Sequence, residues 1–168
     1  MAVPMRRRRR RGSRDRGAAA VEFALVVLPL LLLIMGILDY GRFFFDSVSL
    51  RQGAREAARQ AVVDMYGSCT GSDVGVKIAC NAKAASDLTI GTPLVHIPAV
   101  TEAVTGKGTQ GQQLLVCMQT KETGTGFVPL PAGGIIKTKT YMSIEIASVI
   151  VDSYSDAAPV GGDWTWCS

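Results

Sequence analysis

The chain has 168 residues, 48% of them hydrophobic, and a formal net charge of +4. This length allows one domain with an appendage. Eight arginines precede residue 17, whereas the chain from residue 18 onward carries ten basic and thirteen acidic residues. An arginine run is compatible with nucleic-acid binding or a nuclear address, but the mildly acidic remainder argues against a nucleic-acid-binding domain.

Residues 18–38 are predicted to form a transmembrane helix. Glu22 is the only charged side chain among these 21 residues, which at about 1.5 Å per residue reach roughly 30 Å, the thickness of a bilayer core. Arginines beside a span stay in the cytoplasm. We therefore expect residues 1–17 to be a basic cytoplasmic leader. The chain after about Tyr40 is expected to be extracytoplasmic, in a single-pass protein of the cytoplasmic (inner) membrane.

A cleavable secretory signal is the competing interpretation, because it also has a basic start and an apolar middle. Such a signal needs small residues in an A-x-A arrangement after the apolar run, but here residues 39–45, DYGRFFF, follow it. The small residues, Gly17–Ala20, lie before the run instead. A peptidase acting near the start should therefore cut before the apolar run and leave the span attached.

The order of these pieces resembles the processing region of type IV pilin-like proteins. Gly17 ends the basic leader, four residues follow, and Glu22 and Phe23 begin the apolar helix. The segments VEFALVVLPLLLLIMGILDYGRFFF and GAREAARQAV extend the likeness over about residues 16–63. In this combination they closely resemble the TadE-like family, minor pilin-like proteins of the tight adherence (Flp pilus) machinery.

The resemblance implies processing by an aspartyl prepilin peptidase between Gly17 and Ala18, which makes Glu22 the fifth residue of the mature chain. In pilin-like proteins the carboxylate at that place is thought to pair with the terminal amine of a neighbouring subunit. Such a pairing gives a physical reason for Glu22, because an isolated carboxylate in lipid is costly. The alternative is a Glu22 that is solvated at headgroup level.

The resemblance also implies a function: a minor pilin or pseudopilin subunit that acts in assembly of a tight adherence (Flp type IVb) pilus, in adhesion and in secretion. The implied partners are the major Flp pilin, a second minor pilin, inner-membrane platform proteins and a prepilin peptidase. The alternative is a membrane-tethered extracytoplasmic binding module that does not polymerise. The spacing from Gly17 to Glu22 favours the pilin-like function, since a simple anchor would not require it.

Residues 39–66 are predicted to continue the helix outside the membrane. Pro29 should kink the helix within the span, because proline removes a backbone hydrogen bond. No proline follows between Asp39 and Met65, and Gly67 marks a plausible end. Apolar side chains recur at helical spacing in this extension: Tyr40, Phe44, Val48, Ala54, Ala58, Ala61, Val62 and Met65.

Three arginines, Arg51, Arg55 and Arg59, recur every four residues along a separate stripe of the same extension. Glu56 has the spacing for an ion pair with Arg59. This stripe is a candidate docking surface for anionic lipid or for an acidic neighbour in the assembly. A solvated helix face is the simpler interpretation.

Residues 67–168 are predicted to form a small β-rich extracytoplasmic domain, which gives an α+β fold overall. Residues 76–88 suit a short helix, and residues 112–120 and 135–151 suit strands. Alternation along the last segment puts apolar and charged side chains on opposite faces. The apolar set is Met142, Ile144, Ile146 and Ile150, and the charged set is Lys137, Lys139 and Glu145. We expect a small antiparallel sheet packed on the outer half of the helix.

The four cysteines all lie in the predicted extracytoplasmic part, where disulfides persist. Three pairings are possible, and the sequence does not choose among them. The short loop between Cys69 and Cys80 contains two glycines and favours that pair, which leaves Cys117 with Cys167. Free buried thiols are the alternative. A metal site is disfavoured because there is no C-x-x-C motif and only one histidine.

The sequence does not favour an enzyme. His96 is the only histidine and lies among apolar residues, and no phosphate-binding loop or carboxylate pair has a motif spacing. We therefore expect no catalytic residue, no cofactor and no metal. Trp164 and Trp166 are candidates for an adhesive surface, but burial in a strand or fixing of the chain end is the preferred interpretation.

Overall fold

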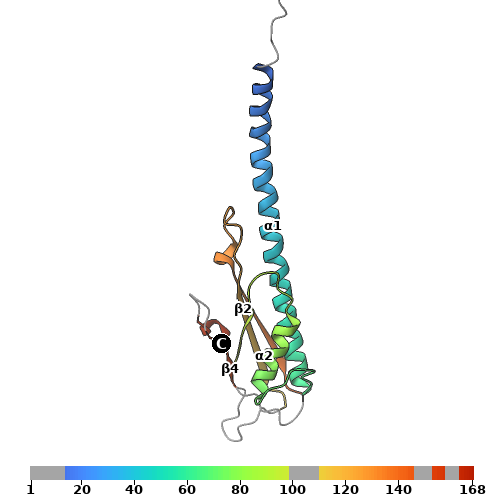
Figure 1. Ribbon diagram of the computed structural model, residues 1–168. Coiled ribbons are helices and arrows are strands. Elements are labelled where there is room, and N and C mark those ends of the chain that lie inside the picture. Colours follow the sequence, from blue (N-terminus) through green and yellow to red (C-terminus); the bar gives the residue numbers. More distant parts are fainter. Residues whose placement is uncertain (1–13, 99–109, 146–152, 158–162) are drawn as a thin grey trace, which may run out of the picture.

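The computed structural model describes residues 14–98, 110–145, 153–157 and 163–168. They form one long helix, α1 (Arg14–Val62), and a small domain that packs along its C-terminal half (Figure 1). The predicted α+β fold class, with a long apolar N-terminal helix and a small antiparallel sheet, is confirmed.

Helix α1 has 49 residues and continues without a break through Pro29. Its most apolar 18-residue window, near the N-terminus, is 0% buried. In the described ranges it is the one helix long and apolar enough to cross a membrane. The helix ends four residues before the predicted limit of residue 66. Asp64 and Gly67, with φ of 54° and 57°, turn the backbone away from the helix axis.

The C-terminal half of α1 buries a stripe of mostly small side chains against the domain. Its fully buried members are Leu50, Ala54, Ala57, Ala58 and Ala61. Small side chains let the second helix approach closely. At Gly53 even a Cβ atom would lie 2.7 Å from the carbonyl oxygen of Ala82.

Among the apolar residues that recur at helical spacing, Ala54, Ala58, Ala61 and Val62 are buried, whereas Phe44, Val48 and Met65 are exposed. Nearer the apolar half, the buried face of α1 carries Asp39 and Asp46 instead. The domain presents loop backbone and hydroxyl groups at these two levels, and a buried loop needs hydrogen-bond acceptors more than apolar contacts.

Helix α2 (Val74–Ala85) packs beside α1 and corresponds to the helix predicted over residues 76–88. Its buried residues include Ile78, Ala79 and Ala82. The disulfide Cys69–Cys80 joins the turn that follows α1 to the middle of α2.

Four strands form one antiparallel sheet in the order β3-β2-β1-β4. Their bounds are β1, Leu94–Ile97; β2, Gln113–Lys121; β3, Ile135–Ser143; and β4, Tyr154–Ser155. The predicted strands over residues 112–120 and 135–151 correspond to β2 and β3, although β3 ends at Ser143 and residues 146–152 lie outside the described residues. The sequence analysis did not predict β1 and β4.

The core lies between α1, α2 and one face of the sheet. The sheet contributes the buried side chains of Val95, Ile97, Leu114, Val116 and Met118. Alternation places Cys117 of β2 on the opposite face, where it is joined to Cys167 in the 3₁₀ turn η2 (Thr165–Cys167). Trp164 stacks on His96 of β1 on that face, with ring centroids 5.1 Å apart, so these residues fasten the C-terminal segment to the sheet.

Candidate functional site

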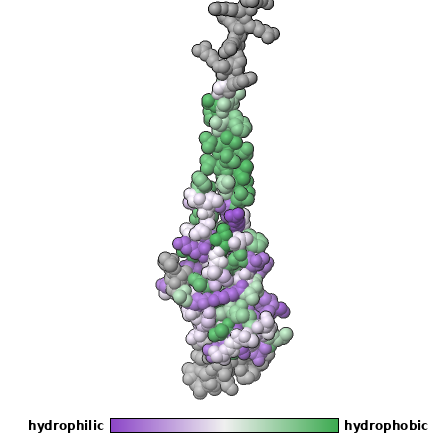
Figure 2. Space-filling view, viewed as in Figure 1, coloured by the Kyte–Doolittle hydropathy of each residue, from purple (hydrophilic) through white to green (hydrophobic). Residues whose placement is uncertain are grey.

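The N-terminal half of α1 exposes apolar side chains on all sides. The exposed fraction lies between 48% and 71% for Val21, Phe23, Leu25, Val26, Leu28, Leu30, Leu31, Leu32, Leu33, Ile37 and Leu38. Figure 2 shows this band in green above the mixed surface of the domain. So large an apolar surface is unfavourable in water and calls for a lipid bilayer or a protein partner around the helix.

Gly17 and Glu22 lie on α1 at the N-terminal end of this band, and both are exposed. Five residues at about 1.5 Å per residue separate them by roughly 7.5 Å along the axis. A Cβ atom at Gly17 would meet nothing within 4 Å, so packing does not explain the glycine. Glu22 has no ion-pair partner among the residues that the structure describes.

Two buried aspartates fasten the domain to α1 where the apolar band ends. Asp39 is 3% exposed and accepts hydrogen bonds from Thr125, at 3.2 Å from its backbone nitrogen and 2.6 Å from its hydroxyl oxygen. The neighbouring Tyr40 hydroxyl donates to the carbonyl oxygen of Pro129 at 3.1 Å. These contacts hold the loop between β2 and β3 against the helix.

Asp46 lies seven residues further, two helical turns along the same face. It is fully buried and accepts bonds of 2.9 Å from both the backbone nitrogen and the hydroxyl oxygen of Thr89. The backbone nitrogen of Ile90 lies 3.4 Å from its other carboxylate oxygen. The sequence analysis missed Asp39 and Asp46. Their spacing of seven residues places them on one face of the helix, but it does not indicate their partners.

Glu122 lies at the end of β2 next to Asp46 and is 4% exposed. Burial, together with the hydrogen bond and the charge of Asp46, raises the pKa of Glu122 to about 8. The folded protein therefore keeps Glu122 protonated at a pH where the unfolded chain has lost that proton.

We expect Glu122→Gln to change how stability depends on pH. In the wild type, the raised pKa of Glu122 makes the free energy of unfolding fall as pH rises from about 4.5 to about 8, by an amount on the order of a few kcal/mol. Glutamine cannot ionise, so the variant should lack this fall. Denaturant unfolding of the full chain in detergent, followed by tryptophan fluorescence, measures the difference between the two proteins. Parallel pH curves would contradict the assignment.

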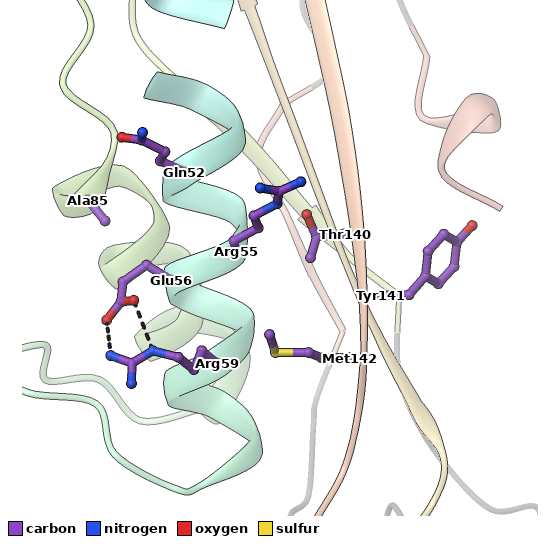
Figure 3. Close-up of a pocket in the computed structure, with 8 residues that line it drawn as sticks. All are labelled: Gln52, Arg55, Glu56, Arg59, Ala85, Thr140, Tyr141 and Met142. Atoms are coloured by element: carbon purple, nitrogen blue, oxygen red, sulfur yellow. Dashed lines mark hydrogen bonds and ion pairs between the residues drawn. The ribbon is translucent and has the colours of Figure 1, made fainter. Parts of the chain in front are cut away.

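The three arginines of the stripe have different surroundings in the structure. Glu56 and Arg59 form the predicted ion pair, at 2.8 Å, on the exposed surface of α1. This hydrogen bond lowers the pKa of Glu56 and raises that of Arg59. Arg55 points toward β3 (Figure 3). Arg51 is exposed but does not line the groove into which Arg55 points.

That groove lies between α1 and β3 and has a volume of about 560 Å³. Its lining consists of Gln52, Arg55, Glu56, Arg59, Ala85, Thr140, Tyr141 and Met142. One wall is polar and contains two arginines, and the other is a strand at the edge of the sheet. An acidic or extended partner segment fits this combination.

The structure contains both disulfides that the sequence analysis favoured, Cys69–Cys80 and Cys117–Cys167. No group of three or more potential metal ligands occurs among the residues of known placement. His96 is partly buried, which lowers its pKa, and it packs on Trp164.

The described part of the chain is thus a long helix followed by a small α+β domain with two disulfides. The N-terminal half of the helix is apolar and exposed, and it is long enough to cross a membrane. These features define the class of protein as single-helix membrane-anchored, by length and composition of the helix. The model of the family described as TadE-like protein matches residues 17–59 and so confirms the resemblance. This TadE-like region covers 43 of the 168 residues. It contains Gly17, Glu22 and the arginine stripe, and it ends before α2 and the sheet. Comparisons with curated proteins and with solved structures gave no match.

Proposed function

We propose that this protein is a non-enzymatic minor pilin-like subunit that acts in assembly of a tight adherence pilus. The observation that carries the proposal is the placement of Gly17 and Glu22 at the N-terminal end of a bare apolar helix, inside the TadE-like region. The arginines before residue 17 favour a cytoplasmic N-terminus, with the domain on the opposite side of the membrane.

Processing between Gly17 and Ala18 is the first step of the proposed function. Helix α1 begins at Arg14, so this bond lies within the first turns of the helix, which a peptidase must open. Glycine is a poor helix former, and the ends of helices open most easily. A glycine at this place therefore lowers the free energy needed to expose the bond.

Glu22 then acts when the subunit leaves the bilayer. An exposed carboxylate at the edge of an apolar helix is solvated while it remains near headgroups, but it must be neutralised once neighbouring helices surround it. The free amine of a processed neighbour, such as the major Flp pilin, supplies the opposite charge. Pairing in a dry environment also fixes the axial register between the two helices.

The domain supplies contacts outside the membrane. Arg55, Glu56 and Arg59 border the groove beside β3 and form the candidate docking surface, with Arg51 next to it along the helix. A second minor pilin and the platform proteins are the partners proposed for the domain and for the helix, respectively.

A deletion strain tests this function directly. Loss of the gene should reduce surface pili and adhesion, and expression of the full chain should restore both. A membrane-tethered binding module that does not polymerise predicts normal pili in the deletion strain. Imaging of pili by electron microscopy, with adhesion measured on the same cells, separates the two functions.

A further inference from the structure

The loop between β2 and β3 reaches back along α1 as far as the apolar band. Val128 contacts the helix at Gly36, where a Cβ atom would lie 3.6 Å from the valine side chain. Gly36 precedes Leu38, the last residue of the apolar run, by two positions, or about 3 Å along the axis. In Figure 1 this loop rises beside α1, away from the rest of the domain.

Phe127 lies at this level and is 70% exposed, although it belongs to the domain and not to the helix. Gly126, with φ of +84°, turns the backbone immediately before it. The hydrogen bonds from Thr125 to Asp39 and from Tyr40 to Pro129 hold the loop on both sides of Phe127. The exposed ring is therefore fixed beside the end of the apolar band.

The composition of the loop suits a lipid environment. Residues 123–134 contain no charged side chain, and two of them are prolines, which have no backbone N–H to desolvate. Aromatic side chains are enriched at the level where hydrocarbon meets headgroups. On the helix, Arg42 and Phe45 are exposed and lie about one and two turns beyond Leu38. At that level the guanidinium group of Arg42 meets lipid phosphates.

We propose that residues 125–130 enter the outer surface of the bilayer and that Phe127 is their anchor. The inference rests on the proposed function only in that α1 spans the membrane. The surface that receives the loop is continuous with the lipid around the apolar band of α1. The protein thus contacts the membrane at two points, the span and the loop, and the second contact fixes the tilt and rotation of the domain.

Phe127→Trp tests the proposal, with Tyr141→Trp as the matched control. Tyr141 is also an exposed aromatic residue, 47% exposed, but it lies on β3 in the part that we place in water. The full chain of each variant is reconstituted in phosphatidylcholine vesicles with and without brominated acyl chains. The emission of the wild type, which has Trp164 and Trp166, is subtracted.

The emission added by Phe127→Trp should be shifted to shorter wavelength, and most of it should be lost in brominated lipid. The emission added by Tyr141→Trp should change little. Because the loop has no cation, the quenching should be the same when anionic phosphatidylglycerol is included. Quenching that appears only with anionic lipid would overturn the hydrophobic contact.

Extraction with alkaline carbonate separates the two possible failures. If α1 remains in the vesicles but the two variants are quenched equally, the loop contact is wrong and the span stands. If the protein is extracted, the span itself is wrong, and the proposed function fails with it.

Discussion

Replacing Glu22 by alanine should leave the protein in the membrane and remove most of its contribution to pilus assembly. The change makes the apolar band longer and does not touch the domain, so insertion and folding should be preserved. In the assembled fibre, however, the amine of the neighbouring subunit would be left without its partner. An uncompensated charge in a dry environment costs about 3–5 kcal/mol, which corresponds to a more than hundredfold loss in incorporation. The number of pili per cell should therefore fall to that of the deletion strain.

Two variants make this result specific. Glu22→Gln keeps the size and polarity of the side chain but not its charge, and should fail like alanine. Leu25→Ala removes an apolar side chain, 71% exposed, from the same helix and should assemble normally. Mass spectrometry of each membrane fraction should find a chain beginning at Ala18, which shows that processing is intact. Normal piliation with Glu22→Gln would rule out the charge pair.

Replacing Asp46 by alanine should destabilise the domain by about 3 kcal/mol. The fully buried carboxylate accepts two hydrogen bonds from Thr89, and alanine leaves these donors without an acceptor. Thr89 is exposed, so water can replace part of the lost contact. A hydrogen bond to a charged group contributes about 1.5–3 kcal/mol, and the better helix propensity of alanine returns only about 0.5 kcal/mol. The same change removes the charge beside Glu122, and this relief limits the total.

Denaturant unfolding of the full chain in detergent measures the effect, and the matched control is Glu145→Ala. Glu145 is an exposed acid just after β3, with no ion pair to another described residue. A double change, Asp46→Asn with Glu122→Gln, should recover part of the lost stability. It keeps an amide oxygen as an acceptor for Thr89, and it removes the cost of keeping Glu122 protonated. A loss below about 1 kcal/mol for Asp46→Ala would mean that the loop around Thr89 is held by other contacts.

The parts of the fold that were predictable from sequence are those with a strong periodic pattern. Their pattern repeats over two or more helical turns or over several strand residues. These parts are the apolar run, the small residues of α1 up to Val62, α2, and the strands β2 and β3. β1 has four residues and β4 has two, which is too short for alternation to be recognised. These strands depend on contacts distant in sequence, such as the bonds that Asp156 accepts from Lys83 and from the backbone nitrogen of Val95.

The candidate site shows the same division. Gly17 and Glu22 could be recognised because their spacing is a local property of the chain. The roles of Asp39 and Asp46 could not be, because their partners, Thr125 and Thr89, lie 86 and 43 residues away. An acid on a helix outside a membrane is ordinarily solvated, and only the folded loops make these two into buried acceptors.

The attachment of the two loops at Asp39 and Asp46 has a mechanical consequence. Both attachments lie on one side of α1, two turns apart, and join the helix to loops of the domain packed beside it. Tension applied along the axis would load both sets together in shear, so that neither loop is peeled away ahead of the other. A pull on the apolar end would therefore move the domain as one body with the helix.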